Sequence, residues 1–170
     1  AKFTLLGTGT STGVPMIGCQ CNTCLSNDFR DKRLRCSLLI QTDKTTVIID
    51  TSSDFRQQML EHKINNINGI IYTHHHFDHI GGFDDIRAIN FAMQEPIDIY
   101  ASISTFSHLQ RIFSYAFSEP EQIGGGVPLI NSIVIEKEEF VVNDIKILPI
   151  PISRGKLQIL GFRIGGFAYL

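Results

Sequence analysis

Short apolar runs rich in β-branched residues recur along the first hundred residues, and polar stretches separate them. Their length and composition predict β-strands. The five runs lie at residues 2–6, 37–41, 46–49, 68–72 and 97–101. The second and third runs flank the polar turn Thr42-Asp43-Lys44, which predicts a hairpin, and Asp50 follows the third run directly.

Helical periodicity separates some of these strands. Residues 53–62 predict a helix with Phe55, Met59 and Leu60 inward and a serine cap at position 52 or 53. A second helix is predicted at residues 83–93. Between residues 106 and 117, apolar residues recur at helical spacing and form a stripe, which we interpret as core packing rather than a cofactor site. This stripe consists of Phe106, Leu109, Ile112, Phe113 and Phe117.

The last third of the chain reads as a meander of strands. It follows a glycine-rich segment at residues 124–128, which predicts a flexible loop. The predicted strands cover residues 132–136, 139–142, 145–150, 160–164 and 167–170. The whole pattern indicates a layered α/β protein, and because no repeat or low-complexity linker divides it, we expect a single domain over residues 1–170.

Composition narrows the functional class. The chain has 170 residues, 43% of them hydrophobic, which is enough for one core. Fifteen basic and 17 acidic residues give a net charge of −2, so no general positive field attracts nucleic acid, and the charge disfavours it as a partner. We interpret the basic cluster at positions 30, 32, 33 and 35 as a solvated loop. No apolar stretch approaches the ~20 residues of a membrane span, and the sequence shows no targeting segment, so a cytoplasmic protein is expected.

The strongest chemical feature is the segment from Thr73 to Gly82, which contains His74, His76, Asp78 and His79. Imidazole nitrogens and carboxylate oxygens bind zinc, manganese or iron at open hydrolytic sites. In an extended segment His74 and His76 point to the same side, so they can bind one ion together. Asp78 and His79 fall where the chain turns and can face a second ion. A surface histidine cluster is the alternative.

Two other histidines are assigned different roles. His75 lies between two candidate ligands and should face the opposite way, which favours packing or support of the ligands. His108 lies in a helical stretch among polar residues and is interpreted as a surface histidine.

Three thiols lie within six residues near the N-terminus. Cys19, Cys21 and Cys24 have a spacing that suits a structural zinc site with one further ligand. Free or redox-active thiols and a disulfide are the alternatives. Cys36 is available as a fourth ligand, but it opens a strand-like run and also fits the role of a small buried hydrophobe.

The His-x-His-x-Asp-His segment after a buried strand resembles the metallo-β-lactamase superfamily. The glycine- and threonine-rich segment at residues 7–15, the cysteines and Ile49-Asp50-Thr51 are similar to the branch that contains the phosphoribosyl cyclic phosphodiesterase of phosphonate breakdown. The tRNA 3′-processing endonucleases are more distant relatives of this branch. The resemblance implies a four-layer αββα sandwich of the α/β (α+β) class and two divalent metal ions at the active site.

The resemblance also implies residue roles. His74 and His76 would bind the first ion, Asp78 and His79 the second, and a bridging hydroxide would attack a small or cyclic phosphodiester. Asp50 would orient a ligand imidazole, with Asp54 a second candidate for this role and helix capping or a surface position its alternative. Thioester or lactone hydrolysis is the runner-up, because the same hydroxide attacks carbonyl carbon. A homodimer is an assembly that the sequence leaves open.

The sequence departs from this family near its end. The resemblance implies a third histidine where the chain has Ser153-Arg154-Gly155-Lys156, and arginine stays protonated and cannot bind a metal. The bridging aspartate would be expected just after residues 167–170, where the chain stops, and no histidine follows His108. These features predict a C-terminally incomplete hydrolase, a variant, or a catalytically impaired metal-binding protein.

Overall fold

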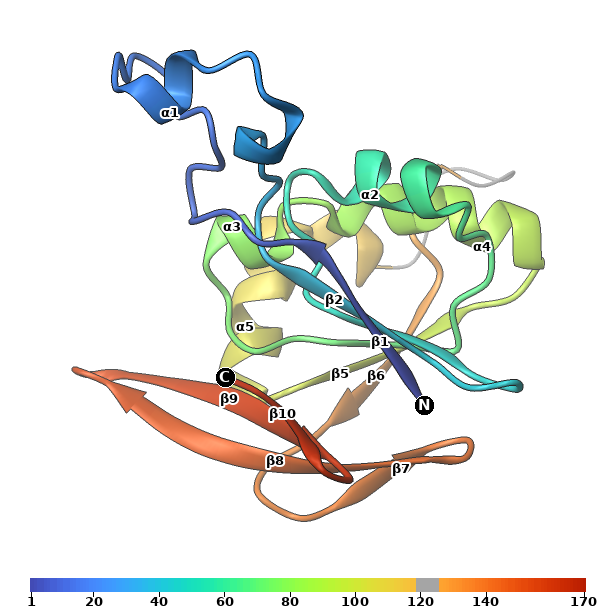
Figure 1. Cartoon of the computed structure of the whole chain (residues 1–170). Helices are drawn as coiled ribbons and strands as arrows, with labels where there is room; N and C mark the ends of the chain where they lie inside the picture. Colours follow the sequence, from blue (N-terminus) through green and yellow to red (C-terminus); the bar gives the residue numbers. More distant parts are fainter. Residues whose placement is uncertain (119–125) are drawn as a thin grey trace.

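Residues 1–118 and 126–170 are described in the computed structural model of the chain. They form two β-sheets with helices on one side (Figure 1). The helices are α1 (Asn22–Leu25), α2 (Phe55–His62), α3 (Phe77–Ile80), α4 (Ile86–Met93) and α5 (Ile103–Ile112), with short 3₁₀ turns at Phe29–Asp31, Phe83–Asp85 and Ser114–Ala116. A bilayer crossing would need a longer and more apolar helix than any within these residues.

The first sheet has six strands in chain order. They are β1 (Lys2–Gly7), β2 (Ser37–Gln41), β3 (Thr46–Ile49), β4 (Gly69–Ile71), β5 (Ile97–Ala101) and β6 (Ile130–Val134). The β1, β2 and β3 strands pair antiparallel, whereas β3 through β6 pair parallel. The carboxyl ends of β3, β4 and β5 therefore meet at one edge of the sheet.

The second sheet has four antiparallel strands in the order β10-β9-β8-β7. They are β7 (Phe140–Val142), β8 (Ile145–Arg154), β9 (Leu157–Ile164) and β10 (Phe167–Tyr169). The β8 and β9 strands are longer than predicted, because Arg154 pairs with Leu157 and extends the hairpin to its tip. The segment expected to contribute a ligand is thus a β-turn, in which Gly155 takes φ of 62°.

Two apolar cores hold the layers together. One lies between the helices and the six-stranded sheet, and the other lies between the two sheets. Successive residues of β3 alternate between them: Ile48 joins the helical core, whereas Val47 and Ile49 join the core between the sheets. Both faces of the central strands β2 to β5 are therefore buried, which is why these strands read as nearly continuous apolar runs.

The structure contains three layers of the expected four-layer sandwich. In Figure 1 the described helices lie on the side of the six-stranded sheet that faces away from β7–β10. The outward face of the second sheet has apolar residues, among them Val141 and Leu170, which are 50% and 77% exposed. Within residues 1–118 and 126–170, no helix supplies the fourth layer of the αββα arrangement on that face.

Several predictions of helix boundaries and burial need correction. The α2 helix begins at Phe55, and its N-cap is Asp54 rather than a serine. Phe55 and Met59 are buried as predicted, but Leu60 is 61% exposed, because helical spacing alone does not show how wide the covered face is. Ile112 is likewise 42% exposed at the end of α5. Of the predicted loop at 124–128, residues 124 and 125 lie outside the described part of the chain.

An excursion of the chain, here called the cysteine arm, spans residues 8–36 and connects β1 to β2. It projects beyond the layered body and contains α1 (Figure 1). Two arginines of the basic cluster predicted as a solvated loop brace this arm from within, and one of them also attaches it to the body. Arg33 Nη1 donates to Thr8 Oγ1 at 2.7 Å, and Arg35 Nε donates to the Ser11 carbonyl at 2.9 Å. Arg35 also pairs with Asp54 at 2.8 Å, so the Asp54 carboxylate supports the arm and not a candidate ligand.

Candidate metal centre

The candidate ligands lie on one loop at the carboxyl edge of the parallel strands. We call residues 73–79 the ligand loop; it follows β4 and leads into α3. Its first residues are fixed by backbone pairing, because Tyr72 N donates to the Tyr100 carbonyl at 2.9 Å and Leu160 N donates to the Thr73 carbonyl at 3.0 Å. Ligand sites in open α/β sheets gather at this edge.

Asp50 lies beneath this loop at the end of β3. Its side chain is fully buried, and its backbone has φ of 64°, a left-handed conformation that costs a non-glycine residue about 1–3 kcal/mol. Two hydrogen bonds hold this conformation: Asp50 N donates to the Ile71 carbonyl at 2.9 Å, and Ser37 Oγ donates to the Asp50 carbonyl at 2.8 Å. The strained turn aims the Asp50 carboxylate at the ligand loop.

The Asp50 carboxylate accepts three hydrogen bonds from the loop. Thr73 N donates to Oδ1 at 2.9 Å, whereas Thr73 Oγ1 and His79 Nδ1 donate to Oδ2 at 2.8 and 2.7 Å. Since the Thr73 hydroxyl gives its proton to Asp50, the contact of Thr73 Oγ1 with His74 Nδ1 at 3.0 Å requires a proton on Nδ1. With Nδ1 as the protonated atom of each ring, the neutral forms of His74 and His79 present an unprotonated Nε2, the atom that a metal would bind.

The four candidate ligands form two close pairs of donor atoms. His74 Nε2 lies 3.1 Å from His76 Nδ1, and His79 Nε2 lies 3.3 Å from Asp78 Oδ2. The ring centroids of His74 and His79 are 4.2 Å apart, so the two pairs are neighbours. The distances thus group His74 with His76 and Asp78 with His79.

Electrostatics differ between the two pairs. Burial, together with neighbouring His79 and His76, lowers the pKa of His74 to about 4, so its ring is neutral at pH 7. Burial alone would lower the pKa of His79 as well. However, the hydrogen bond to Asp50 and the charges of Asp50 and Asp78 outweigh burial and raise the pKa of His79 above its ordinary value.

Arg154 lies at the β8–β9 tip, and its positive charge opposes protonation of His79. The register explains this proximity: β9 contacts the ligand loop at Leu160, and Leu157, three residues away, pairs with Arg154. A guanidinium donates hydrogen bonds but offers no lone pair to a metal. Position 154 thus adds a fixed cation near the Asp78 and His79 pair.

His75 turns away from the candidate ligands and stacks on His108 of α5. The two ring centroids are 3.6 Å apart and the rings are inclined by 8°. Burial, followed by His108, His76 and Arg111, lowers the pKa of His75, so its ring is neutral at pH 7. His108 lies at the surface and is partly buried, and its ring also contacts the ligand loop, which the sequence did not indicate.

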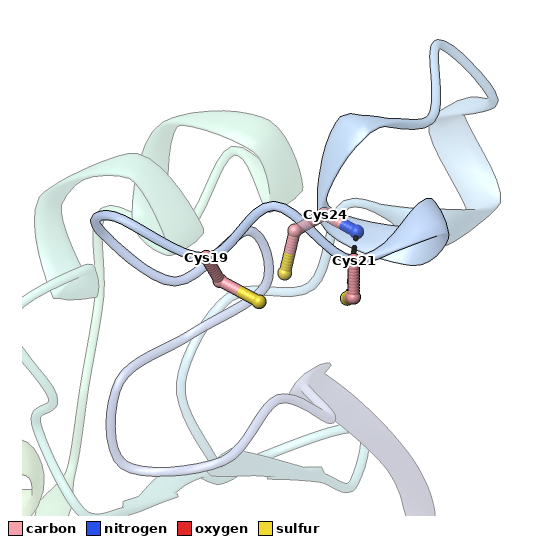
Figure 2. Close-up of side chains that lie close together, drawn as sticks. All are labelled: Cys19, Cys21 and Cys24. Carbon is pink, nitrogen blue, oxygen red and sulfur yellow. Dashed lines mark hydrogen bonds between the residues drawn. The ribbon is translucent and has the colours of Figure 1, made fainter.

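The three cysteines of the arm form a second group of donors. Figure 2 shows the sulfurs of Cys19, Cys21 and Cys24 turned toward one another, and all three lie within 4.8 Å of one another. Within residues 1–118 and 126–170 this is the one set of three such donors that is so compact. A hydrogen bond from Cys24 N at 3.5 Å, with smaller contributions from the neighbouring thiols, lowers the pKa of Cys21 and favours the thiolate that a metal requires.

All four cysteines are free, so the structure contains no disulfide among them. Cys36 lies apart from the group, and its Sγ donates to the Gly9 carbonyl at 3.0 Å. Burial and the charges of Asp50 and Asp78 raise the pKa of the Cys36 thiol. Its surroundings therefore favour a neutral, half-buried thiol and not a fourth zinc ligand.

Two residues of the site were missed from sequence. Thr73 precedes the histidines and links Asp50 to His74, and the one available sign was a hydroxyl residue placed directly between a buried strand and a candidate ligand. His108 contacts a residue 33 positions earlier in the chain, and nothing local to either residue indicates their contact.

Comparison with known proteins identifies the family of this chain. The family model described as "Beta-lactamase superfamily domain" matches residues 45–170. A curated relative, an octanoyltransferase of Porphyromonas gingivalis, is 41% identical over 168 residues, which cover 98% of this chain and 33% of the relative. The chain thus spans about a third of that relative's length.

Solved structures share the fold. The crystal structure of a diphosphatase from the PhnP family is 37% identical, with a TM-score of 0.88 over 99% of this chain and 64% of that chain. Zn²⁺-bound PqqB from Methylobacterium extorquens has a TM-score of 0.71 and 17% identity, over 98% of this chain and 62% of that one. The short form of human tRNase Z has a TM-score of 0.61 and 16% identity, over 95% and 64%.

The donor set fits divalent metal ions, because four nitrogen and oxygen donors face one another in pairs and buried partners fix the two rings that present Nε2. The fold agrees with that of the solved structures. The chain therefore belongs to the β-lactamase superfamily, the hydrolase family with the metallo-β-lactamase fold.

Proposed function

We propose that this chain is the metal-binding part of a hydrolase that cleaves a small or cyclic phosphodiester with two divalent ions. The observation that carries the proposal is the arrangement of the ligand loop, in which His74 pairs with His76 and Asp78 pairs with His79. Bound divalent ions would supply an activated water and stabilise negative charge on the phosphoryl oxygens. Zinc, manganese and iron are all compatible with these ligands.

The chain's own residues have distinct roles in this proposal. Asp50 accepts the Nδ1 proton of His79, and Thr73 accepts that of His74, so both rings keep Nε2 directed outward. Cys19, Cys21 and Cys24 would hold a structural zinc that stabilises the cysteine arm. The phosphoryl substrate class is supported by the 37% identity with a diphosphatase.

A second candidate is thioester hydrolysis. The curated relative at 41% identity is named an octanoyltransferase, an enzyme class that handles acyl groups. This chain matches only 33% of that relative, so the name bears on the chain only as a substrate class to test.

The test is to load the purified chain with Mn²⁺ or Zn²⁺ and measure turnover of bis(p-nitrophenyl) phosphate and of an octanoyl thioester. We expect hydrolysis of the diester in preference to the thioester, loss of hydrolysis in His74→Ala, and no change in the matched surface variant His62→Ala. Preference for the thioester would replace the phosphodiester proposal. Equal activity in His74→Ala and in the unaltered chain would refute the assignment of the site.

Arg154→His tests whether the site lacks a third ligand histidine at position 154. A histidine at the β8–β9 tip replaces a fixed cation with a possible ligand, so we expect tighter metal binding and faster hydrolysis than in the unaltered chain. An unchanged metal affinity and rate would show that position 154 does not limit this site.

A further inference from the structure

The ligand loop has a buried half, which contains Thr73 and His74, and an exposed half, which contains His76 and Phe77. The two halves are held by different contacts. Thr73 and His74 are 8% and 5% exposed, and hydrogen bonds fix them to Asp50 and β9. His76 and Phe77 are exposed, Phe77 at 60%. The ring of His76 has a hydrogen-bond contact only with His74 among the described residues, and that contact joins two candidate ligands to each other. The backbone bonds of α3 order the main chain here, but the side chain of His76 needs a further contact to hold its position.

The stacked ring of His108 supplies this contact. It lies flat on His75, at 3.6 Å between centroids, and His75 in turn lies edge-on to His76 at 5.6 Å and 74°. The three rings form a continuous contact from α5 to a candidate metal ligand. Each ring limits the positions that the next can take.

The α5 helix is a rigid support for this contact. Ser102 caps its start by accepting a hydrogen bond from Thr105 N at 3.2 Å, and Phe106 and Leu109 anchor it in the helical core. His108 Nδ1 donates to the Ser104 carbonyl at 2.9 Å, which fixes the rotation of the ring. The face of His108 is thus presented to His75 before any metal binds.

We propose that His108 is a positioning residue for the metal site: stacked on His75, it holds the exposed half of the ligand loop in the geometry that places His76 beside His74. The effect on metal binding rests on the proposed function, whereas the effect on the order of the loop does not. The two effects can therefore be measured apart.

The first measurement is amide hydrogen exchange by NMR on the metal-free chain. The N–H groups of His79 and Ile80 donate to the His76 carbonyl at 2.9 and 3.2 Å, so their exchange reports the order of this half of the loop. We expect faster exchange in His108→Ala and protection restored in His108→Phe, which keeps a flat ring. Ser107→Ala, the exposed neighbour on the same helix, should leave exchange unchanged.

The second measurement is Mn²⁺ affinity, chosen because nitrogen and oxygen donors suit Mn²⁺ better than thiolates do. We expect His108→Ala to weaken binding about three- to tenfold, the range of a stacked aromatic pair, and His108→Phe to restore it. In a double-mutant cycle, His108→Ala should add little once His75→Ala has removed its partner.

Two outcomes separate the two proposals. If His108→Ala and Ser107→Ala show equal exchange at His79 and Ile80, the positioning role is wrong, whatever the metal affinity. If the unaltered chain does not bind Mn²⁺ at the ligand loop, the proposed function fails, while the exchange data still decide whether His108 orders the loop.

Discussion

Replacing Asp50 by asparagine should weaken metal binding at the ligand loop, because it moves the ring proton of His79 from Nδ1 to Nε2. Asparagine has nearly the same shape and can still accept the hydrogen bond from Thr73 N. Its NH₂ group, however, would face two donors, Thr73 Oγ1 and His79 Nδ1, at 2.8 and 2.7 Å. His79 can satisfy that amide only by accepting at Nδ1, which moves its proton to Nε2, the atom that should face the metal.

The size of the effect follows from the bonds involved. A hydrogen bond to a charged group contributes about 1.5–3 kcal/mol, and loss of such a partner of a ligand histidine typically weakens metal binding by about 10–100-fold. We therefore expect Asp50→Asn to raise the dissociation constant for Mn²⁺ about 10–100-fold. The free energy of unfolding of the metal-free chain should fall by only about 1–3 kcal/mol, since a buried charge is removed together with its bonds.

The assay is a competition titration of Mn²⁺ against a chromophoric chelator, with urea denaturation of the metal-free protein in parallel. Asp98→Asn is the matched control, because Asp98 makes one hydrogen bond to Asn131 near the opposite end of β5 from the ligand loop. Equal Mn²⁺ affinity in Asp50→Asn and Asp98→Asn would refute the reasoning. Such a result would mean that the Asp50–His79 bond does not set the tautomer of the ligand.

Three further predictions concern the rest of the molecule. Metal analysis of Cys21→Ser should show one bound zinc fewer per chain, whereas Cys36→Ser should retain the zinc. Cys21→Ser should also lower the melting temperature of the zinc-loaded protein clearly while changing its turnover little. Phe83→Ala should lower the free energy of unfolding by about 3–5 kcal/mol in urea, because Phe83 is fully buried, while Phe91→Ala, at a 67% exposed position, should change it by less than about 0.5 kcal/mol. The free energy of unfolding of the metal-free chain should decrease as pH falls from 6.5 to about 4. In this range the unfolded chain binds a proton at His74 and the folded chain does not. His74→Gln should make this pH dependence shallower.

Local patterns in the sequence predicted the strands well. The hairpin of β2 and β3 has the predicted bounds, because apolar runs of this length between polar turns leave few alternatives. Predictions of which helical residues are covered were less accurate. Leu60 and Ile112 lie on the edges of their apolar stripes, and whether an edge position is buried depends on how closely the neighbouring elements approach.

The candidate site was predictable where its residues are close in sequence. His74, His76, Asp78 and His79 fall in one loop, so their proximity needed no knowledge of the fold. The contact of His108 with the loop was not predictable, because it depends on how α5 packs on the sheet. The same holds for the β8–β9 tip, where extension of the hairpin to Arg154 depends on strand pairing across the turn.

The cysteine arm has a thermodynamic consequence. Its helix α1 has no buried residue, and neither apolar core includes a side chain from residues 8–36. The arm is therefore attached to the body by polar contacts such as the Arg35–Asp54 ion pair, and inside it by contacts such as Arg33 with Thr8 and by any ion that its thiolates bind, and not by the hydrophobic effect that holds the sheets. Heating should then produce two separate transitions in calorimetry, an early one that a chelator shifts and a later one that it leaves in place. A single melting temperature would describe neither part of the molecule.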